Sequence, residues 1–349
     1  MRLDSNIFRF LCAALLTLAI ALGLARETML IIEARTANTN LFMRHRLREM
    51  IAALPKIAKI SDPVVLVFGS SDMEIEFHPD IFDSVMNERG KKVVSFNLAV
   101  RNGMPVLREI VAKVQAAQIK PAMSIVKFTP DFLTQTVKQT WRVSEDVKAS
   151  LASGRELLAQ RILFDGMSPS MARYYVSDWL NPERRFKFSD DSPLIFRNRE
   201  LNSEPAWDFD KRGFFYFGWP QTKESLTRVL KEYSDPSVQA AVLRFHENCC
   251  DMAAMRFDDG LLREMTESLK TLRLLSKETI LLYYPDRVPR SVEANRRLQK
   301  ALEKVAREAG VELLQIDGLL KPADFIDPVH LTLEGGQKLT RDLAQALSR

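Results

Sequence analysis

Two short segments, far apart in the chain, carry residue types that together can make a serine hydroxyl nucleophilic. The segment VVLVFGSS runs from five apolar residues straight into Ser70 and Ser71. The segment DPVH, close to the other end of the chain, contains Asp327 and His330. A histidine can accept the proton of a serine hydroxyl, and an aspartate bonded to the imidazole fixes its tautomer. Brought together, these residues predict acyl transfer or ester hydrolysis.

Each of these residues, taken singly, also has an ordinary structural interpretation. A serine that follows a parallel strand is more often a helix cap or a turn residue, and Asp-x-x-His occurs by chance in many chains. The catalytic interpretation therefore depends on the fold. In a doubly wound sheet, the end of the first strand and the loop after the last strand can meet at one edge, where backbone N–H groups are available to an oxyanion.

An alternation of apolar strands and helical segments predicts such a sheet. We expect strands at residues 64–68, 93–100, 123–128, 279–284 and 311–316, and helices at residues 79–90, 104–118, 291–310 and 334–348. This alternation is typical of a parallel sheet with helices on both faces. The sequence therefore predicts an α/β fold with about five parallel strands.

The alternation is interrupted between the third and fourth expected strands. It breaks at Thr129 and Pro130, and we predict a largely helical insertion at residues 131–260, which holds all four tryptophans. The densest aromatic run of the insertion, RGFFYFGWP, is interpreted as the core of a subdomain. The alternative is a cap or a membrane-facing surface over the ends of the strands.

The N-terminal segment is apolar enough to meet a membrane. Residues 10–25 read FLCAALLTLAIALGLA without a charge, and a bilayer span needs about 18 such residues. We predict that residues 1–35 form an uncleaved anchor, the alternatives being a cleaved signal peptide and a buried helix of a cytosolic protein. Residues 36–62 are expected to form a helical connector, with His45 and the neighbouring Arg46 on a solvated helix face.

Composition and charge exclude several classes of function. The 349 residues are 46% apolar and carry a net charge of +5, without a run of basic residues or a nucleic-acid motif. We therefore expect no binding of nucleic acid. The three cysteines, of which Cys249 and Cys250 are adjacent, indicate no disulfide framework, and with His246 nearby they lack the spacing of a metal site. We expect neither a metal ion nor a cofactor.

The two reactive segments resemble the blocks that define the SGNH, or GDSL-like, hydrolase superfamily. The first block of that superfamily ends in Gly-x-Ser and the last is Asp-x-x-His, which GSS and DPVH match. The longer runs GSSDMEIEFHPDIFD, SFNLAVRNGMP and DPVHLTLEGGQKL are similar to the branch that accompanies cell-envelope acylation, including the D-alanyl transfer protein and the alginate and cellulose acetylation proteins. The resemblance covers residues 64–130 and 279–349, and it implies a flavodoxin-like SGNH domain over residues 63–349, interrupted by the insertion.

The resemblance also implies roles for individual residues. Ser71 matches the nucleophile, with Ser70 as its neighbour on the turn, and His330 and Asp327 match the base and the residue that orients it. The implied protein is a membrane-anchored, periplasmic acyltransferase or esterase acting on acyl esters, with acetyl as the expected group, of an envelope polysaccharide. A membrane-bound O-acyltransferase is the implied partner. A plain periplasmic esterase and a non-catalytic scaffold or binding module are the alternatives.

The oxyanion-binding positions match the superfamily less well. The second block implies a backbone N–H from Gly103, with Asn102 as the alternative. The third block, normally Gly-x-Asn-Asp, reads KFTPDF here, which leaves Thr129 as the candidate donor. Loss of one oxyanion donor can cost on the order of a hundredfold in rate. The missing asparagine therefore favours the acyl-transfer branch, or a non-catalytic member, over a general esterase.

Three further features have simpler interpretations. His78, before Pro79, is expected in a cap or surface position. Asp286, which follows the fourth expected strand, is expected to turn the chain, although it could contact substrate. Gly335 and Gly336 are expected to allow close packing of the last helix, because they lack the context of a phosphate-binding loop.

Overall fold

The computed structural model describes residues 13–17, 39–100, 104–134, 207–214, 236–237, 240, 254–316, 318 and 320–349. At the centre of this part of the chain is a five-stranded, parallel sheet with the order β2-β1-β3-β4-β5. The strands are β1 (Val64–Phe68), β2 (Val94–Asn97), β3 (Met123–Lys127), β4 (Glu278–Tyr283) and β5 (Glu312–Gln315). This is the order of a flavodoxin-like, doubly wound sheet, so the predicted fold class is confirmed.

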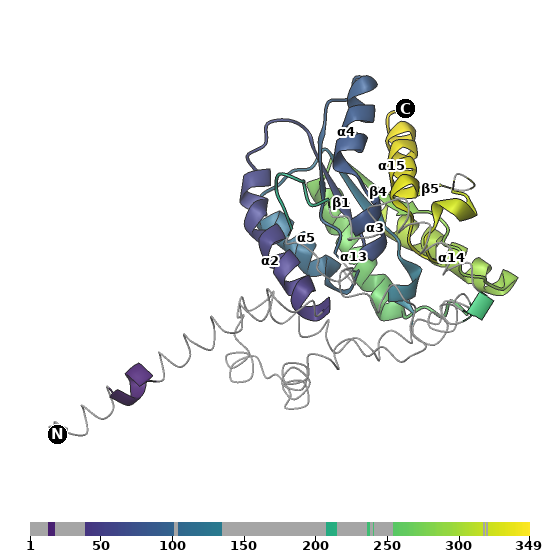
Figure 1. Cartoon of the computed structure of the whole chain (residues 1–349), viewed down its shortest axis with the longest axis horizontal. Coiled ribbons are helices and arrows are strands. Elements are labelled where there is room, and N and C mark those ends of the chain that lie inside the picture. The colour runs from purple at the N-terminus through teal and green to yellow at the C-terminus, as the bar shows by residue number, and fades with distance from the viewer. Residues whose placement is uncertain are drawn as a thin grey trace.

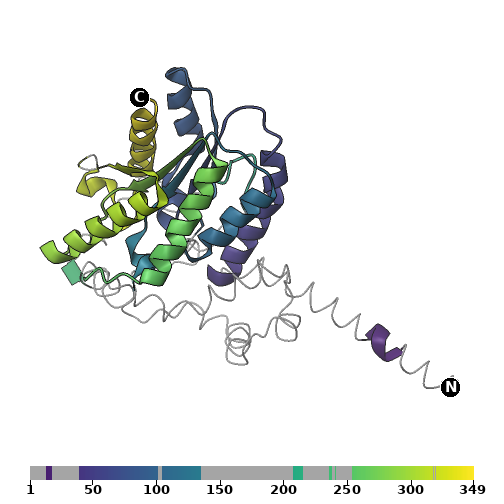
Figure 2. The ribbon, with the colours of Figure 1, turned by 180° about the vertical axis from the view of Figure 1, so that it is seen from behind.

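Helices cover both faces of the sheet (Figure 1). One face carries α3 (Ser71–Glu76), α4 (Pro79–Glu88) and α15 (Leu333–Leu347). Figure 2 shows the opposite face, which carries α2 (Thr39–Ile57), α5 (Leu107–Ala116), α13 (Asp259–Leu275) and α14 (Val292–Ala309). Among the described residues, three short 3₁₀ helices lie in the connections, at Met104–Val106, Pro130–Leu133 and Pro322–Asp324.

The apolar strands form because each has a core on both sides. In β1, Leu66 and Phe68 pack into the core beneath α2, α5, α13 and α14, and Val65 and Val67 pack into the core beneath α3, α4 and α15. Successive side chains of a strand point to opposite faces, so a strand buried on both faces reads as a continuous apolar run. This is why VVLVF could be identified as a central strand.

The sheet also creates a position for a site. The chain leaves β1 through α3 and α4 on one face, and it leaves β3 toward α13 on the other. The connections after these two neighbouring strands therefore diverge at the carboxyl end of the sheet. Such a divergence is the topological switch point where doubly wound folds bind ligands. Ser71, the first residue of α3, stands at this point.

Helix α2 lies within the predicted connector but differs from the prediction in one respect. Its residues Leu47, Met50 and Leu54 are buried in the core. Arg46, expected on a solvated face, is also fully buried. It forms an ion pair with Glu74 of α3 at 2.5 Å and donates a hydrogen bond to a backbone carbonyl of the insertion. The prediction was wrong because the partners of this guanidinium lie far along the chain.

The insertion and the N-terminal segment lie mostly outside the described residues. The N-terminal segment is the predicted anchor, residues 1–35. No helix in the described part of the chain is long and apolar enough to cross a membrane. The described residues 207–214, here called the edge segment, pack beside β2. Trp207 Nε1 donates to the carbonyl of Asn97 at 2.9 Å, and the backbone N–H of Asn97 donates to the carbonyl of Arg212 at 2.8 Å. One part of the insertion therefore belongs to the edge of the sheet.

Candidate active site

The chain turns sharply between β1 and α3, and this turn presents Ser71. Ser70 occupies the N-cap position in an extended conformation, and Ser71 begins the helix. A Cβ atom added to Gly69 would lie 2.6 Å from the Cβ of Met73, so only glycine lets the strand and the helix approach this closely. Ser70 is fully buried, whereas Ser71 is partly exposed. The second serine is therefore the accessible one.

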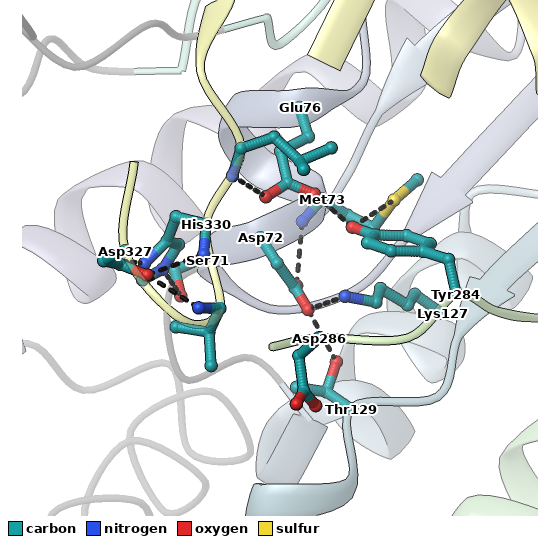
Figure 3. Close-up of polar contacts among 12 residues, drawn as sticks. Ser71, Asp72, Met73, Glu76, Lys127, Thr129, Tyr284, Asp286, Asp327 and His330 are labelled. Atoms are coloured by element: carbon teal, nitrogen blue, oxygen red, sulfur yellow. Dashed lines mark hydrogen bonds and ion pairs between the residues drawn. The ribbon is translucent and has the colours of Figure 1, made fainter. Parts of the chain in front are cut away.

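The structure brings together the three residues that the sequence places at the two ends of the domain (Figure 3). Ser71 Oγ lies 3.0 Å from His330 Nε2, although the residues are 259 positions apart. His330 Nδ1 lies 2.8 Å from Asp327 Oδ2. The other oxygen of Asp327 accepts the backbone N–H groups of Val329 and His330, each at 2.7 Å. Asp327 thus fixes both the imidazole and the loop that carries it.

The environment of His330 favours proton uptake. Burial lowers the pKa of the imidazole, but the nearby anionic groups, first of all Asp327 through its charge and its hydrogen bond, together outweigh burial and raise the pKa above the ordinary value of 6.5. The carboxylates of Glu76 and Asp72 act in the same direction. The side chain is 14% exposed, so it can reach a bound molecule. A serine-activating base needs this combination of access and proton affinity.

A second group of polar side chains, of which the sequence-based prediction named only Thr129, lies directly behind Ser71 (Figure 3). Asp72 forms a buried ion pair with Lys127, the last residue of β3. Asp72 also accepts the backbone N–H of Met73 at 2.8 Å and the hydroxyl of Thr129 at 3.4 Å. Lys127 Nζ lies 3.7 Å from the centre of the Tyr284 ring, a cation–π contact. The charge next to the serine is therefore neutralised within the protein.

Glu76 extends this group to the loop of the histidine. The hydroxyl of Tyr284 donates to one carboxylate oxygen of Glu76, and the backbone N–H of Leu331 donates to the other at 2.8 Å. Burial raises the pKa of Glu76 to about 7, although Lys127, Tyr284 and His330 act against this. A sequence signal existed in retrospect, because SDMEIEF sets acidic residues among apolar ones, and KF at the end of β3 sets a lysine inside a buried strand.

The predicted oxyanion donors have different outcomes. Gly103 and Asn102 lie outside the described residues. Thr129 is buried two residues after β3, and its hydroxyl donates to Asp72 at 3.4 Å. Its role as a donor to an oxyanion stays a prediction.

The predicted cap position of His78 is confirmed, whereas the alternative surface position is not, because the side chain is buried. It occupies the N-cap position of α4 only with its backbone, because its side chain makes no capping hydrogen bond. The imidazole is 7% exposed, and its ring centre lies 4.3 Å from that of Phe214 in the edge segment. Burial, aided by the charge of Arg341, lowers the pKa of His78 to about 4. The imidazole is therefore neutral near pH 7 and packs against Phe214.

Two further expectations hold, one for a loop and one for helix α15. Asp286 turns the chain, since its carboxylate accepts the backbone N–H of Val288 at 2.9 Å. Gly335 and Gly336 serve close packing: a Cβ added at Gly335 would lie 2.3 Å from a backbone oxygen of the preceding loop, and one added at Gly336 would lie 3.0 Å from the carbonyl oxygen of Glu76. His246, Cys249 and Cys250 lie outside the described residues.

Comparison with known proteins adds little to this picture. No protein family model and no curated protein matches the chain. Among solved structures, the chain is similar to a putative arylesterase from Agrobacterium tumefaciens, with 11% sequence identity, coverage of 82% of this chain and 98% of that one, and a TM-score of 0.32. A likeness at this level carries no argument about activity, so the functional conclusion depends on the site itself.

Proposed function

We propose that the protein cleaves and transfers acyl esters, with Ser71 as nucleophile, His330 as general base and Asp327 as the residue that orients the base. One observation carries the proposal: hydrogen-bond distances run unbroken from Asp327 Oδ2 to His330 and on to Ser71 Oγ, at 2.8 and 3.0 Å. Contact of both imidazole nitrogens, one with a carboxylate and one with an accessible hydroxyl, is the arrangement that nucleophilic catalysis needs.

The first half of the reaction follows from these positions. Ser71 Oγ attacks the carbonyl carbon of the ester while His330 Nε2 takes the hydroxyl proton. The carbonyl π-bond opens, and its electron pair becomes the charge of a tetrahedral oxyanion. The backbone N–H of Ser71, at the start of α3, is the candidate donor to that charge, because the first N–H groups of a helix have no intrahelical partner. Collapse of the intermediate expels the alcohol, which takes the proton from His330.

The second half uses the same groups in reverse. An acceptor hydroxyl or a water molecule gives its proton to His330 and attacks the acyl carbon on Ser71. The ester bond to Ser71 breaks, and the proton returns from His330 to Ser71 Oγ. The acceptor decides whether the outcome is transfer or hydrolysis.

The finer identity of the reaction rests on the resemblance of GSS and DPVH to the envelope-acylation branch of the SGNH superfamily. On that basis we propose an acyltransferase or esterase anchored in the inner membrane by residues 1–35, facing the periplasm and acting on acetyl esters of an envelope polysaccharide. A membrane-bound O-acyltransferase is the proposed partner. A non-catalytic binding module is the second candidate, favoured by the absence of asparagine in KFTPDF.

Turnover of p-nitrophenyl acetate, with and without added oligosaccharides, tests this proposal. The wild type is expected to release nitrophenol and to add acetyl groups to an accepting oligosaccharide, detected by mass spectrometry. Ser71→Ala is expected to do neither, and Ser70→Ala is the matched control, because its hydroxyl is buried and has no hydrogen-bond partner among the described residues. Equal activity of wild type and Ser71→Ala would contradict the proposal, and absence of all activity in a folded wild type would favour the binding module.

A further inference from the structure

Helix α3 carries the nucleophile at its first residue and a fully buried glutamate at its last. Ser71 contacts the imidazole of His330 from one end of the helix. Glu76, from the other end, accepts the backbone N–H of Leu331, the residue next to His330, at 2.8 Å. One short helix therefore contacts both the side chain of the base and the backbone that carries it (Figure 3).

The carboxylate of Glu76 is itself held in place. The hydroxyl of Tyr284, which follows β4, donates to its second oxygen. The backbone of Glu76 is fixed as well, because its carbonyl accepts the hydroxyl of Thr340 in α15 at 3.0 Å. The same carbonyl lies where a Cβ on Gly336 would come within 3.0 Å of it. The glutamate is thus held at its carboxylate and at its backbone carbonyl, and the Leu331 N–H is bonded to this fixed acceptor.

We propose that Glu76 is a positioning residue for His330: it holds the loop of the base onto the helix of the nucleophile through the Leu331 N–H, while Tyr284 fixes the carboxylate. The inference rests on the proposed function, since it concerns the same Ser71–His330 pair. A displacement of about 1 Å between reacting groups can cost on the order of a hundredfold in rate, so a link this close to the base has a measurable effect.

If Glu76 acted through geometry alone, removing only its charge would leave the titration of His330 unchanged, but the charge of Glu76 also raises the pKa of His330. The titratable groups that face Glu76 are Lys127 from β3, Tyr284 from the end of β4, Asp72 from its own helix, and His330. From helix α15, Thr340 donates a hydrogen bond to the carbonyl of Glu76 and Gly336 lies close to it, and neither residue titrates. Removing the negative charge of Glu76 lowers the proton affinity of the imidazole, because a nearby anion favours the charged form of a histidine.

The variant Glu76→Gln isolates this effect. Its amide oxygen can still accept the Leu331 N–H, and its amide group can donate to the Tyr284 oxygen, so the geometry is kept while the charge is lost. Glu74→Gln is the matched control, since Glu74 is two residues away on the same helix, equally buried, and paired with Arg46 instead. The chain has four histidines, so the His330 signal can be assigned in NMR spectra by its loss in His330→Gln.

The decisive measurement is the pH titration of the His330 ring by NMR in the full-length chain. In the wild type, Glu76 and His330 are expected to take up protons as a coupled pair. In Glu76→Gln, the midpoint of His330 is expected to shift to lower pH, and in Glu74→Gln it is expected to stay at the wild-type value. An unchanged midpoint in Glu76→Gln, or an equal shift in Glu74→Gln, would overturn the electrostatic effect of Glu76 on His330, and the geometric role is tested by Glu76→Leu.

Covalent labelling by a fluorophosphonate probe separates this inference from the proposed function. The pH at which labelling of Ser71 is half-maximal is expected to fall in Glu76→Gln, and Glu76→Leu, which cannot accept the Leu331 N–H, is expected to label about a hundredfold more slowly. If the wild type is labelled, and both Glu76 variants are labelled at the same rate and with the same pH dependence as the wild type, the role of Glu76 is overturned while the proposed function stands. A wild type that is not labelled at any pH would overturn the proposed function and the inference with it.

Discussion

The two sides of helix α3 bury the same kind of residue in different ways. On the side of α2 and β2, Glu74 is paired with Arg46, whose guanidinium also donates to the carbonyl of Gly213 in the edge segment at 2.7 Å. On the side of β3, β4 and α15, Glu76 is bonded to a tyrosine hydroxyl and a backbone N–H. We call the first side the Arg46 side and the second the His330 side. The glutamate of the Arg46 side forms a direct ion pair, whereas the glutamate of the His330 side is held by a hydroxyl and a backbone N–H.

This difference separates a structural role from a functional one. A buried carboxylate that is paired with arginine is held ionised and responds little to its surroundings, and breaking such a pair is costly. A buried carboxylate with neutral partners has a raised pKa and couples to other titrating groups nearby. We therefore expect variants on the Arg46 side to change stability and variants on the His330 side to change the reaction and its pH dependence.

The largest effect is expected for the base itself. His330→Ala removes the proton acceptor of Ser71 and is expected to lower kcat for p-nitrophenyl acetate by roughly 10⁴-fold or more. His78→Leu is the control, because it replaces the other histidine whose buried ring is described and which lies outside the Ser71–His330 contact. It is expected to change the free energy of unfolding with little change in kcat. Comparable losses of kcat in His330→Ala and His78→Leu would contradict the claim that His330, and not His78, acts as the base.

The next largest effect is expected on the Arg46 side. Arg46→Met leaves Glu74 buried without its guanidinium and is expected to lower the free energy of unfolding by about 3 to 5 kcal/mol, measured with urea. The double variant Arg46→Met/Glu74→Leu is expected to recover part of this loss, since no charge is then left unpaired. A loss below about 1 kcal/mol in the single variant would mean that Arg46 is not the main partner of Glu74.

A smaller effect is expected where the edge segment meets β2. Gly213 has a φ of 74°, and a Cβ there would lie 2.2 Å from the carbonyl oxygen of Asn97. Gly90 has a φ of 79° with no heavy atom within 4 Å of its added Cβ, so Gly90→Ala isolates the backbone strain. Gly90→Ala is expected to cost about 1 kcal/mol and Gly213→Ala at least about 2 kcal/mol. Equal losses of unfolding free energy in the two variants would show that close packing of Gly213 against Asn97 adds nothing to the backbone strain.

The last expected effect is a change in how stability depends on pH. The folded-state pKa of Glu76, about 7, lies above the ordinary value of 4.5. Its protonated form is therefore favoured by folding: this contribution to stability is complete below pH 4.5 and is lost as the pH rises through about 7. In Glu76→Gln, the fall in unfolding free energy across this window is expected to be shallower, by at most about 1.4 kcal/mol per pH unit. An unchanged slope would contradict the raised pKa.

The sequence was sufficient for the sheet and for the placement of the reactive residues. Continuous apolar runs such as VVLVF occur because central parallel strands are buried on both faces, and Ser71 and His330 follow from the rule that strand ends and final loops meet at one edge. The prediction missed α3 because five of its six residues are buried, so SDMEIE shows no amphipathic period. It also missed the burial of Arg46 and Glu76, whose partners lie as far as 167 and 255 positions away.

The central claim is that the hydroxyl of Ser71 is the nucleophile that His330 activates. The most direct test is to treat the full-length wild type, Ser71→Ala, Ser70→Ala and His330→Ala with a fluorophosphonate and to locate the covalent adduct by peptide mass spectrometry. The adduct is expected on Ser71 in the wild type and in Ser70→Ala, to form far more slowly in His330→Ala, and to be absent from Ser71→Ala. An adduct on any other residue, or formation at the wild-type rate in His330→Ala, would contradict the claim.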